Sequence, residues 1–63
     1  MVAVRMLRQL LGCPQAEFAR LAGLSSRTLI RIEKGDAIAS AETTAQIDKA
    51  FYALILGRLK EGV

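Results

Sequence analysis

The chain has 63 residues, of which 52% are hydrophobic and 24% charged, and a formal net charge of +3. This composition is typical of one small folded domain, here residues 1–63, and excludes a disordered, highly charged tail. The sequence has no histidine, one cysteine, and no apolar run near the ~20 residues that cross a bilayer. We therefore expect a soluble cytoplasmic protein with no cofactor, no metal site, no membrane contact and no enzymatic activity.

Apolar spacing predicts two short helices in the first third of the chain. The first covers about residues 2–11, and its apolar face consists of Val4, Leu7 and Leu11. Pro14 suits the first turn of a second helix, where its missing N–H is no loss. Gly23 can adopt the positive φ that ends this second helix. Further apolar positions that suit a tight turn between two crossing helices are Phe18, Leu21, Leu24, Leu29 and Ile32.

A third helix is expected between the N-cap Ser25 and Gly35. A helical wheel turns Leu29 and Ile32 inward. The opposite face carries Arg27, Ile30, Arg31 and Lys34, with Ser26 at its border. Arginine can donate two hydrogen bonds to a guanine, an isoleucine can contact a thymine methyl group, and lysine or serine commonly contacts phosphate. Four basic residues and one acid between residues 20 and 34 favour a polyanionic partner.

Ser40 can cap a fourth helix. The apolar run of residues 51–56 could continue this helix, begin a new one or form a strand, and we expect the helix to continue to about residue 59, with Gly57 as a candidate break. One stripe of this helix is apolar: Ile47, Ala50, Phe51 and Leu54. A second stripe points in another direction: Tyr52, Ile55, Leu56 and Leu59. A helix that is apolar on two sides needs two packing partners. Residues 52–63 are therefore a candidate dimerisation segment, and the alternative is that they fold back onto the chain's own core.

Residues 15–35 resemble the helix-turn-helix of the lambda-repressor-like, or XRE, family. The matching positions are Gln15, Phe18, Ala19, Ala22, Gly23, Leu24, Leu29, Ile32 and the Glu33-Lys34-Gly35 ending. Arg8 with Gly12, and residues 40–51, extend the resemblance to about residues 2–51. It implies an all-α, compact four- to five-helix fold with the helix-turn-helix at about residues 15–34. Pro14 and Ala39 depart from the family pattern, and so does the chain after Phe51.

The resemblance also implies roles for individual residues. Ser26, Arg27 and Arg31 would occupy base-reading positions, and Ser25 would lie near the DNA backbone. Gln15 would bind a phosphate and brace the recognition helix. Arg8 and Glu33 would form an internal ion pair that does not contact DNA.

Together these observations predict a sequence-specific regulator of transcription that binds double-stranded DNA. We expect a repressor that binds a palindromic operator as a homodimer through the major groove. The alternative is an antitoxin-like or adaptor protein whose C-terminal apolar segment binds a second protein, with DNA binding for autoregulation. An enzyme is not expected, because the acidic residues are scattered and no nucleophile has a histidine partner.

Overall fold

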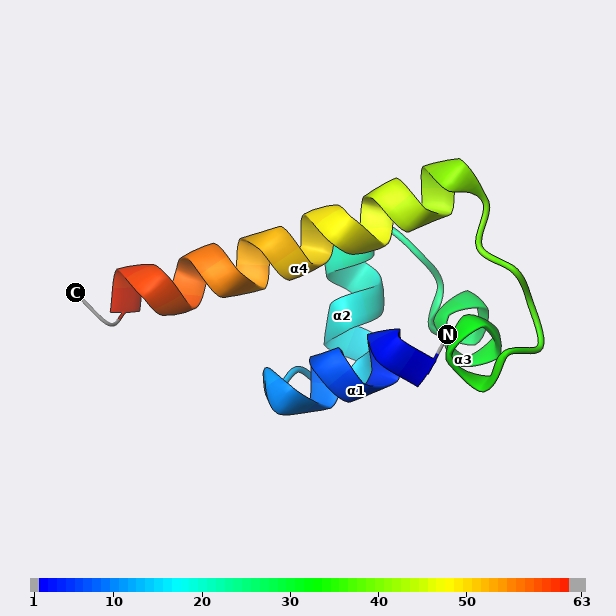
Figure 1. Cartoon of the computed structure of the whole chain (residues 1–63), viewed down its shortest axis with the longest axis horizontal. Coiled ribbons are helices and arrows are strands. Elements are labelled where there is room, and N and C mark those ends of the chain that lie inside the picture. The colour runs from blue at the N-terminus through cyan, green and yellow to red at the C-terminus, as the bar shows by residue number, and fades with distance from the viewer. Residues whose placement is uncertain (1, 62–63) are drawn as a thin grey trace.

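The computed structural model describes the backbone of residues 2–61 and the side chains of residues 3–59. Within this range there are four helices and no strand: α1 (Val2–Leu10), α2 (Gln15–Ala22), α3 (Ser26–Lys34) and α4 (Ala41–Glu61). The long α4 runs the length of the molecule, and α2 crosses between α4 and α1 (Figure 1). At the far end from the C-terminus lies α3. The prediction of an all-α, lambda-repressor-like fold is confirmed.

The ends of α2 and α3 follow from local chemistry. Gly23 (φ 71°) and Gly35 (φ 83°) lie in the left-handed region, which costs a residue without a Cβ atom little. Ser25 caps α3 by accepting a hydrogen bond from the Thr28 N–H at 3.1 Å. Pro14 lies just before α2 and not in its first turn, with extended backbone angles (φ −61°, ψ 150°). Its fixed φ suits this N-cap position equally well, so α2 begins one residue later than expected.

The core lies where the four helices meet. The rings of Phe18 on α2 and Phe51 on α4 are 4.7 Å apart and tilted by 42°. Other buried apolar residues are Val4, Cys13, Ala19, Ala22, Leu29, Ile32, Ile47 and Ala50. Leu7 and Leu21 were expected to face inward, but their side chains are 39% and 44% exposed. On α1 the inner face is centred on Val4 and Arg8, which leaves Leu7 at its flank.

The fourth helix is continuous from Ala41 to Glu61, as expected for a helix that continues to about residue 59, and it does not break at the candidate position Gly57. A glycine inside a helix costs only about 1 kcal/mol relative to alanine, which helix continuation readily offsets. The first half of α4 packs on α2, whereas the second half extends past it (Figure 1). There Arg58 donates a hydrogen bond from Nη2 to the Leu11 carbonyl. This bond satisfies a carbonyl group just after the end of α1.

Candidate nucleic-acid interface

Burial divides α3 into two faces. Leu29 and Ile32 are 0% and 2% exposed and face the core. Arg27, Arg31 and Lys34 are exposed on the other side, and Ile30 is half-buried between the two faces. Within the described part of the chain, none of these three basic side chains has a hydrogen bond or ion pair. Within the described structure, the helix therefore presents three cationic side chains to solvent without an interaction partner.

The other residues expected to contact DNA lie at the first turns of α2 and α3. Ser26 is exposed, and so is Ser25, whose hydroxyl also donates to the Thr28 hydroxyl at 2.8 Å. The cap therefore occupies the Ser25 hydroxyl in the free protein. Gln15 is the first residue of α2, and its amide Nε2 donates to Glu33 Oε1 at 3.0 Å.

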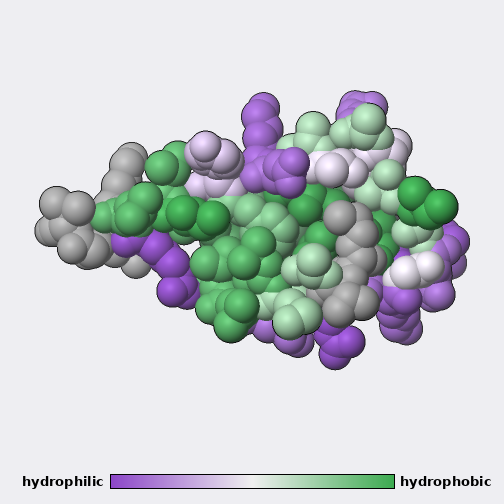
Figure 2. All heavy atoms as spheres, viewed as in Figure 1, coloured by the Kyte–Doolittle hydropathy of each residue, from purple (hydrophilic) through white to green (hydrophobic). Residues whose placement is uncertain are grey.

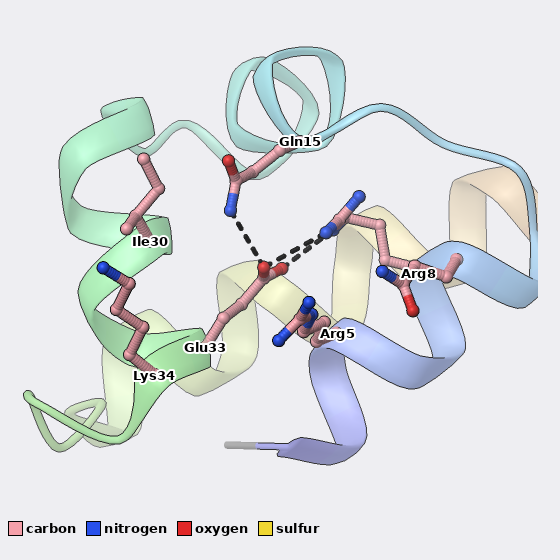
Figure 3. Close-up of a pocket in the computed structure, with 7 residues that line it drawn as sticks. Arg5, Arg8, Gln15, Ile30, Glu33 and Lys34 are labelled. Carbon is pink, nitrogen blue, oxygen red and sulfur yellow. Dashed lines mark hydrogen bonds and ion pairs between the residues drawn. The ribbon is translucent and has the colours of Figure 1, made fainter.

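Glu33 lies at the centre of a buried cluster that joins three helices (Figure 3). Arg8 Nε donates to Glu33 Oε2 at 2.8 Å, and Arg8 Nη2 donates to Glu33 Oε1 at 3.1 Å. A third bond runs from Arg8 Nη1 to the Cys13 carbonyl at 2.9 Å. With the bond from Gln15, these contacts tie α1 and the start of α2 to the end of α3. Arg8 and Glu33, the residues for which the resemblance implies an ion pair, are thus in direct bidentate contact.

The environment of Glu33 favours its charged form. Burial by itself raises the pKa of this carboxyl, but the hydrogen bonds from Arg8 and Gln15 and the charges of Arg8 and Arg5 outweigh that effect. The pKa of Glu33 therefore lies below its usual value. The hydrogen bond to Glu33 raises the pKa of the Arg8 guanidinium, even though burial opposes this. Both groups are charged near neutral pH, so the cluster is a true ion pair.

A pocket of about 330 Å³ opens above this cluster. Its lining is Arg5, Arg8, Gln9, Gln15, Ile30, Glu33 and Lys34. Figure 3 shows Arg5 and Lys34 on two sides of Glu33, with Gln15 across from both. Sequence reasoning missed Arg5 and Gln9. The available signal was their position on α1: Arg5 precedes Arg8 by three residues, which places it on an adjoining part of the same helix.

A second candidate surface lies on the C-terminal half of α4. Tyr52, Ile55, Leu56 and Leu59 are between 44% and 70% exposed and line one shallow hollow. Sequence reasoning missed three exposed apolar residues on α1: Met6, Leu7 and Leu10. Figure 2 shows hydrophobic side chains gathered over α1 and the C-terminal half of α4 on the face in view. The exposed apolar surface is thus wider than the stripe on α4.

The described residues contain neither a side-chain cluster suited to a metal ion nor a membrane-spanning helix. No group of three or more histidine, cysteine, aspartate or glutamate side chains there could hold a metal ion. None of the described helices combines the length and apolar character that a membrane span requires.

Comparison with known proteins agrees with this geometry. A model of the helix-turn-helix family matches residues 4–51, which include most of α1, all of α2 and α3, and the first half of α4. Neither the curated proteins nor the solved structures contain a match. The match covers well over half of the chain and contains the whole Arg8–Glu33 cluster. The chain therefore belongs to the lambda-repressor-like, XRE-type helix-turn-helix family and is a DNA-binding regulator of transcription.

Proposed function

We propose that the chain is a cytoplasmic repressor that binds a two-fold symmetric operator as a homodimer, with α3 of each copy in the major groove. The observation that carries this proposal is the contrast within α3. Arg27 and Arg31 have no hydrogen bond or ion pair with the residues that the structure describes, whereas Glu33 on the same helix is hydrogen-bonded to α1 and α2. Because the contacts of Glu33 hold α3 in place, the helix can present its arginines to base edges with little reorganisation.

Four residues on α3 are proposed to read bases: Ser26, Arg27, Ile30 and Arg31. The two arginines are exposed and can each donate two hydrogen bonds to guanine O6 and N7. Ile30 is only half-buried, which leaves part of its side chain for a thymine methyl group. Ser26 in the first turn of α3 can bond to a base edge or to the backbone.

Three further residues are proposed to bind phosphates: Gln15, Ser25 and Lys34. Gln15 uses one amide N–H for Glu33, so its second N–H remains for a phosphate oxygen. Lys34 is exposed at the last turn of α3 and has no hydrogen bond or ion pair in the described structure. Ser25 must share its hydroxyl between the helix cap and DNA. These contacts would fix the register of α3 without reading sequence.

Selection of bound sequences from a random pool of duplexes at physiological salt tests the DNA-binding proposal. We expect an enriched site with two-fold symmetry and half-sites about 34 Å apart, one turn of B-DNA. An enriched site without symmetry would remove the palindromic operator. Failure to enrich any sequence would overturn sequence-specific binding altogether.

The homodimer rests on the apolar stripe of α4: Tyr52, Ile55, Leu56 and Leu59. These positions follow the i, i+3, i+4, i+7 spacing of a helix–helix contact. The spacing reads the same from either end, so the stripe is complementary to itself when two copies pair antiparallel, as an isologous dimer requires. The hollow that the four residues line has few polar groups that would resist burial.

Sedimentation at micromolar concentration tests the dimer. We expect the wild-type chain to sediment as a dimer and Leu56→Glu as a monomer, because a buried, unpaired carboxylate opposes association. Ile38→Glu is the matched control: Ile38 is 99% exposed in the loop between α3 and α4, outside the stripe, so this variant should stay dimeric.

A wild-type monomer, both free and bound to DNA, would contradict the homodimer. The second candidate is then a different protein that covers the apolar surface of α1 and α4. It is favoured by the exposed apolar side chains of Met6, Leu7 and Leu10, which widen this surface beyond the stripe on α4. In that case the chain would act as an antitoxin-like or adaptor protein, and its DNA binding would serve autoregulation.

A further inference from the structure

The pocket above Glu33 brings together three helices that are separate in sequence. Arg5 and Gln9 come from α1, Gln15 from the first turn of α2, and Ile30 and Lys34 from the outer part of α3. The pocket therefore lies beside the proposed base-reading face and continues it toward α1. Ile30 and Lys34 are four residues apart and therefore lie on the same side of α3, so the pocket borders the base-reading face along one helical turn.

The pocket is positively charged, although it contains a carboxylate. Both oxygens of Glu33 accept hydrogen bonds from Arg8, and one of them also accepts from Gln15. Arg8 therefore neutralises Glu33. Arg5 and Lys34 remain, and neither makes a hydrogen bond or ion pair within the described residues. The charge of Arg5 reaches Glu33 only through space. Two free cations thus flank the opening of the pocket (Figure 3).

We infer that this pocket binds one backbone phosphate of the DNA, held between the Arg5 guanidinium and the Lys34 ammonium. The inference deepens the proposed function and depends on it, and it adds Arg5 of α1 to the DNA-binding residues. Gln15 also lines the pocket, and the amide N–H that it does not use for Glu33 would supply a third donor. Guanidinium groups bind phosphate with two parallel hydrogen bonds, whereas lysine acts as a point charge. A single phosphate would thereby link α1, α2 and α3 to one strand.

The position of the pocket favours a DNA phosphodiester over a free anion. Glu33 is among the residues that line the pocket, so a small anion that entered it would approach a carboxylate. A phosphodiester held at the opening by its own strand stays near Arg5 and Lys34 and farther from Glu33. Binding here requires the rest of the duplex to lie along α3, so inorganic phosphate should not occupy the pocket.

The salt dependence of DNA binding tests the role of Arg5. In Arg5→Gln, we expect the slope of log affinity against log salt to fall by about 0.9, the value for one lost phosphate contact on B-DNA. Affinity at low salt should fall roughly tenfold for selected and random duplexes alike, because a phosphate contact carries no base information. The free energy of unfolding should change little, since Arg5 makes no hydrogen bond or ion pair within the described residues and acts on Glu33 only through space.

Lys49→Gln is the matched control. Lys49 is exposed on α4, a helix that α2 separates from α1 (Figure 1), and its replacement also lowers the net charge by one. We expect its salt slope to equal that of the wild type. If Arg5→Gln also keeps the wild-type slope while the wild-type chain binds its selected site, the inference about Arg5 is overturned and the proposed function stands. If the wild-type chain binds no duplex, the proposed function itself fails.

Neutral methylphosphonates, introduced one position at a time in the selected duplex, identify the phosphate. At one position the neutral substitution should remove the effect of both Arg5→Gln and Lys34→Gln on affinity, because the two cations then have no phosphate charge to contact. Coupling of the two variants to different phosphates would overturn the shared site. Competition by inorganic phosphate beyond its effect on ionic strength would also overturn it, in favour of a free-anion site.

Discussion

The charged residues on the two faces of α3 differ in exposure and in hydrogen bonding. Glu33 and Lys34 are neighbours in sequence, yet Glu33 is 5% exposed with three hydrogen bonds, whereas Lys34 is exposed with none in the described structure. The inner charge joins α3 to α1 and α2, and the outer charges have only solvent to contact. Burial and pairing thus separate the residues that position the recognition helix from those available to the ligand.

Removal of Arg8 should eliminate the ion pair on the inner face of α3 and have the largest effect on stability. Arg8→Ala leaves Glu33 buried without its counterion, and we expect a loss of about 3–5 kcal/mol in the free energy of unfolding. Urea denaturation measures this directly. The matched control is Arg27→Ala on the outer face, which should stay within about 0.5 kcal/mol of the wild type. Equal losses in the two variants would mean that the two faces do not differ as described.

Removal of Arg31 should weaken DNA binding by the outer face of α3 and leave the Arg8–Glu33 pair on the inner face intact. We expect Arg31→Ala to weaken operator binding by about 1–3 kcal/mol and to relax the preference at one base pair. Its free energy of unfolding should match the wild type, because Arg31 is exposed and has no partner in the described residues. Binding measured on a set of single-base operator variants is the test. A uniform loss across all variants would assign Arg31 to phosphate and not to a base.

Acid should lower the free energy of unfolding by less than the removal of Arg8 does. Protonation removes the charge of Glu33 but leaves both side chains of the pair in place. Since the folded-state pKa of Glu33 lies below the usual value of about 4.3, its contribution to stability is complete above that pH. The contribution is lost as the pH falls from there through the folded-state pKa. Carbon NMR titration of Glu33, with unfolding measured over the same range, tests this. An inflection at or above the usual value would contradict it.

Local chemistry in the sequence was enough to predict where α3 begins and ends. Ser25 and Gly35 act through bonds and backbone angles within a few residues, so their roles can be inferred without the tertiary structure. The contact between Arg8 and Glu33, 25 residues apart, was implied only by the family resemblance. The role of Gln15 as a donor to Glu33 belongs to the same long-range geometry.

The neighbours of exposed residues could not be predicted in this way. A helical wheel gives the direction of Arg5 around α1, but not that α3 lies beside it and brings Lys34 to the same pocket. The exposure of Leu10, at 77%, likewise depends on what covers α1. The continuation of α4 to about residue 59 was expected, but the sequence left Gly57 open as a break, because the small propensity cost of one glycine does not decide whether a helix ends.

The most direct test of DNA binding through α3 is an NMR titration of the 15N-labelled chain with its selected duplex. We predict that the largest shift changes fall on the backbone and side-chain N–H groups of Arg27 and Arg31, with smaller changes at Gln15. The buried guanidinium of Arg8 should keep its contact with Glu33 throughout. Changes confined to α4, with Arg27 and Arg31 unaffected at saturation, would contradict recognition of DNA by α3.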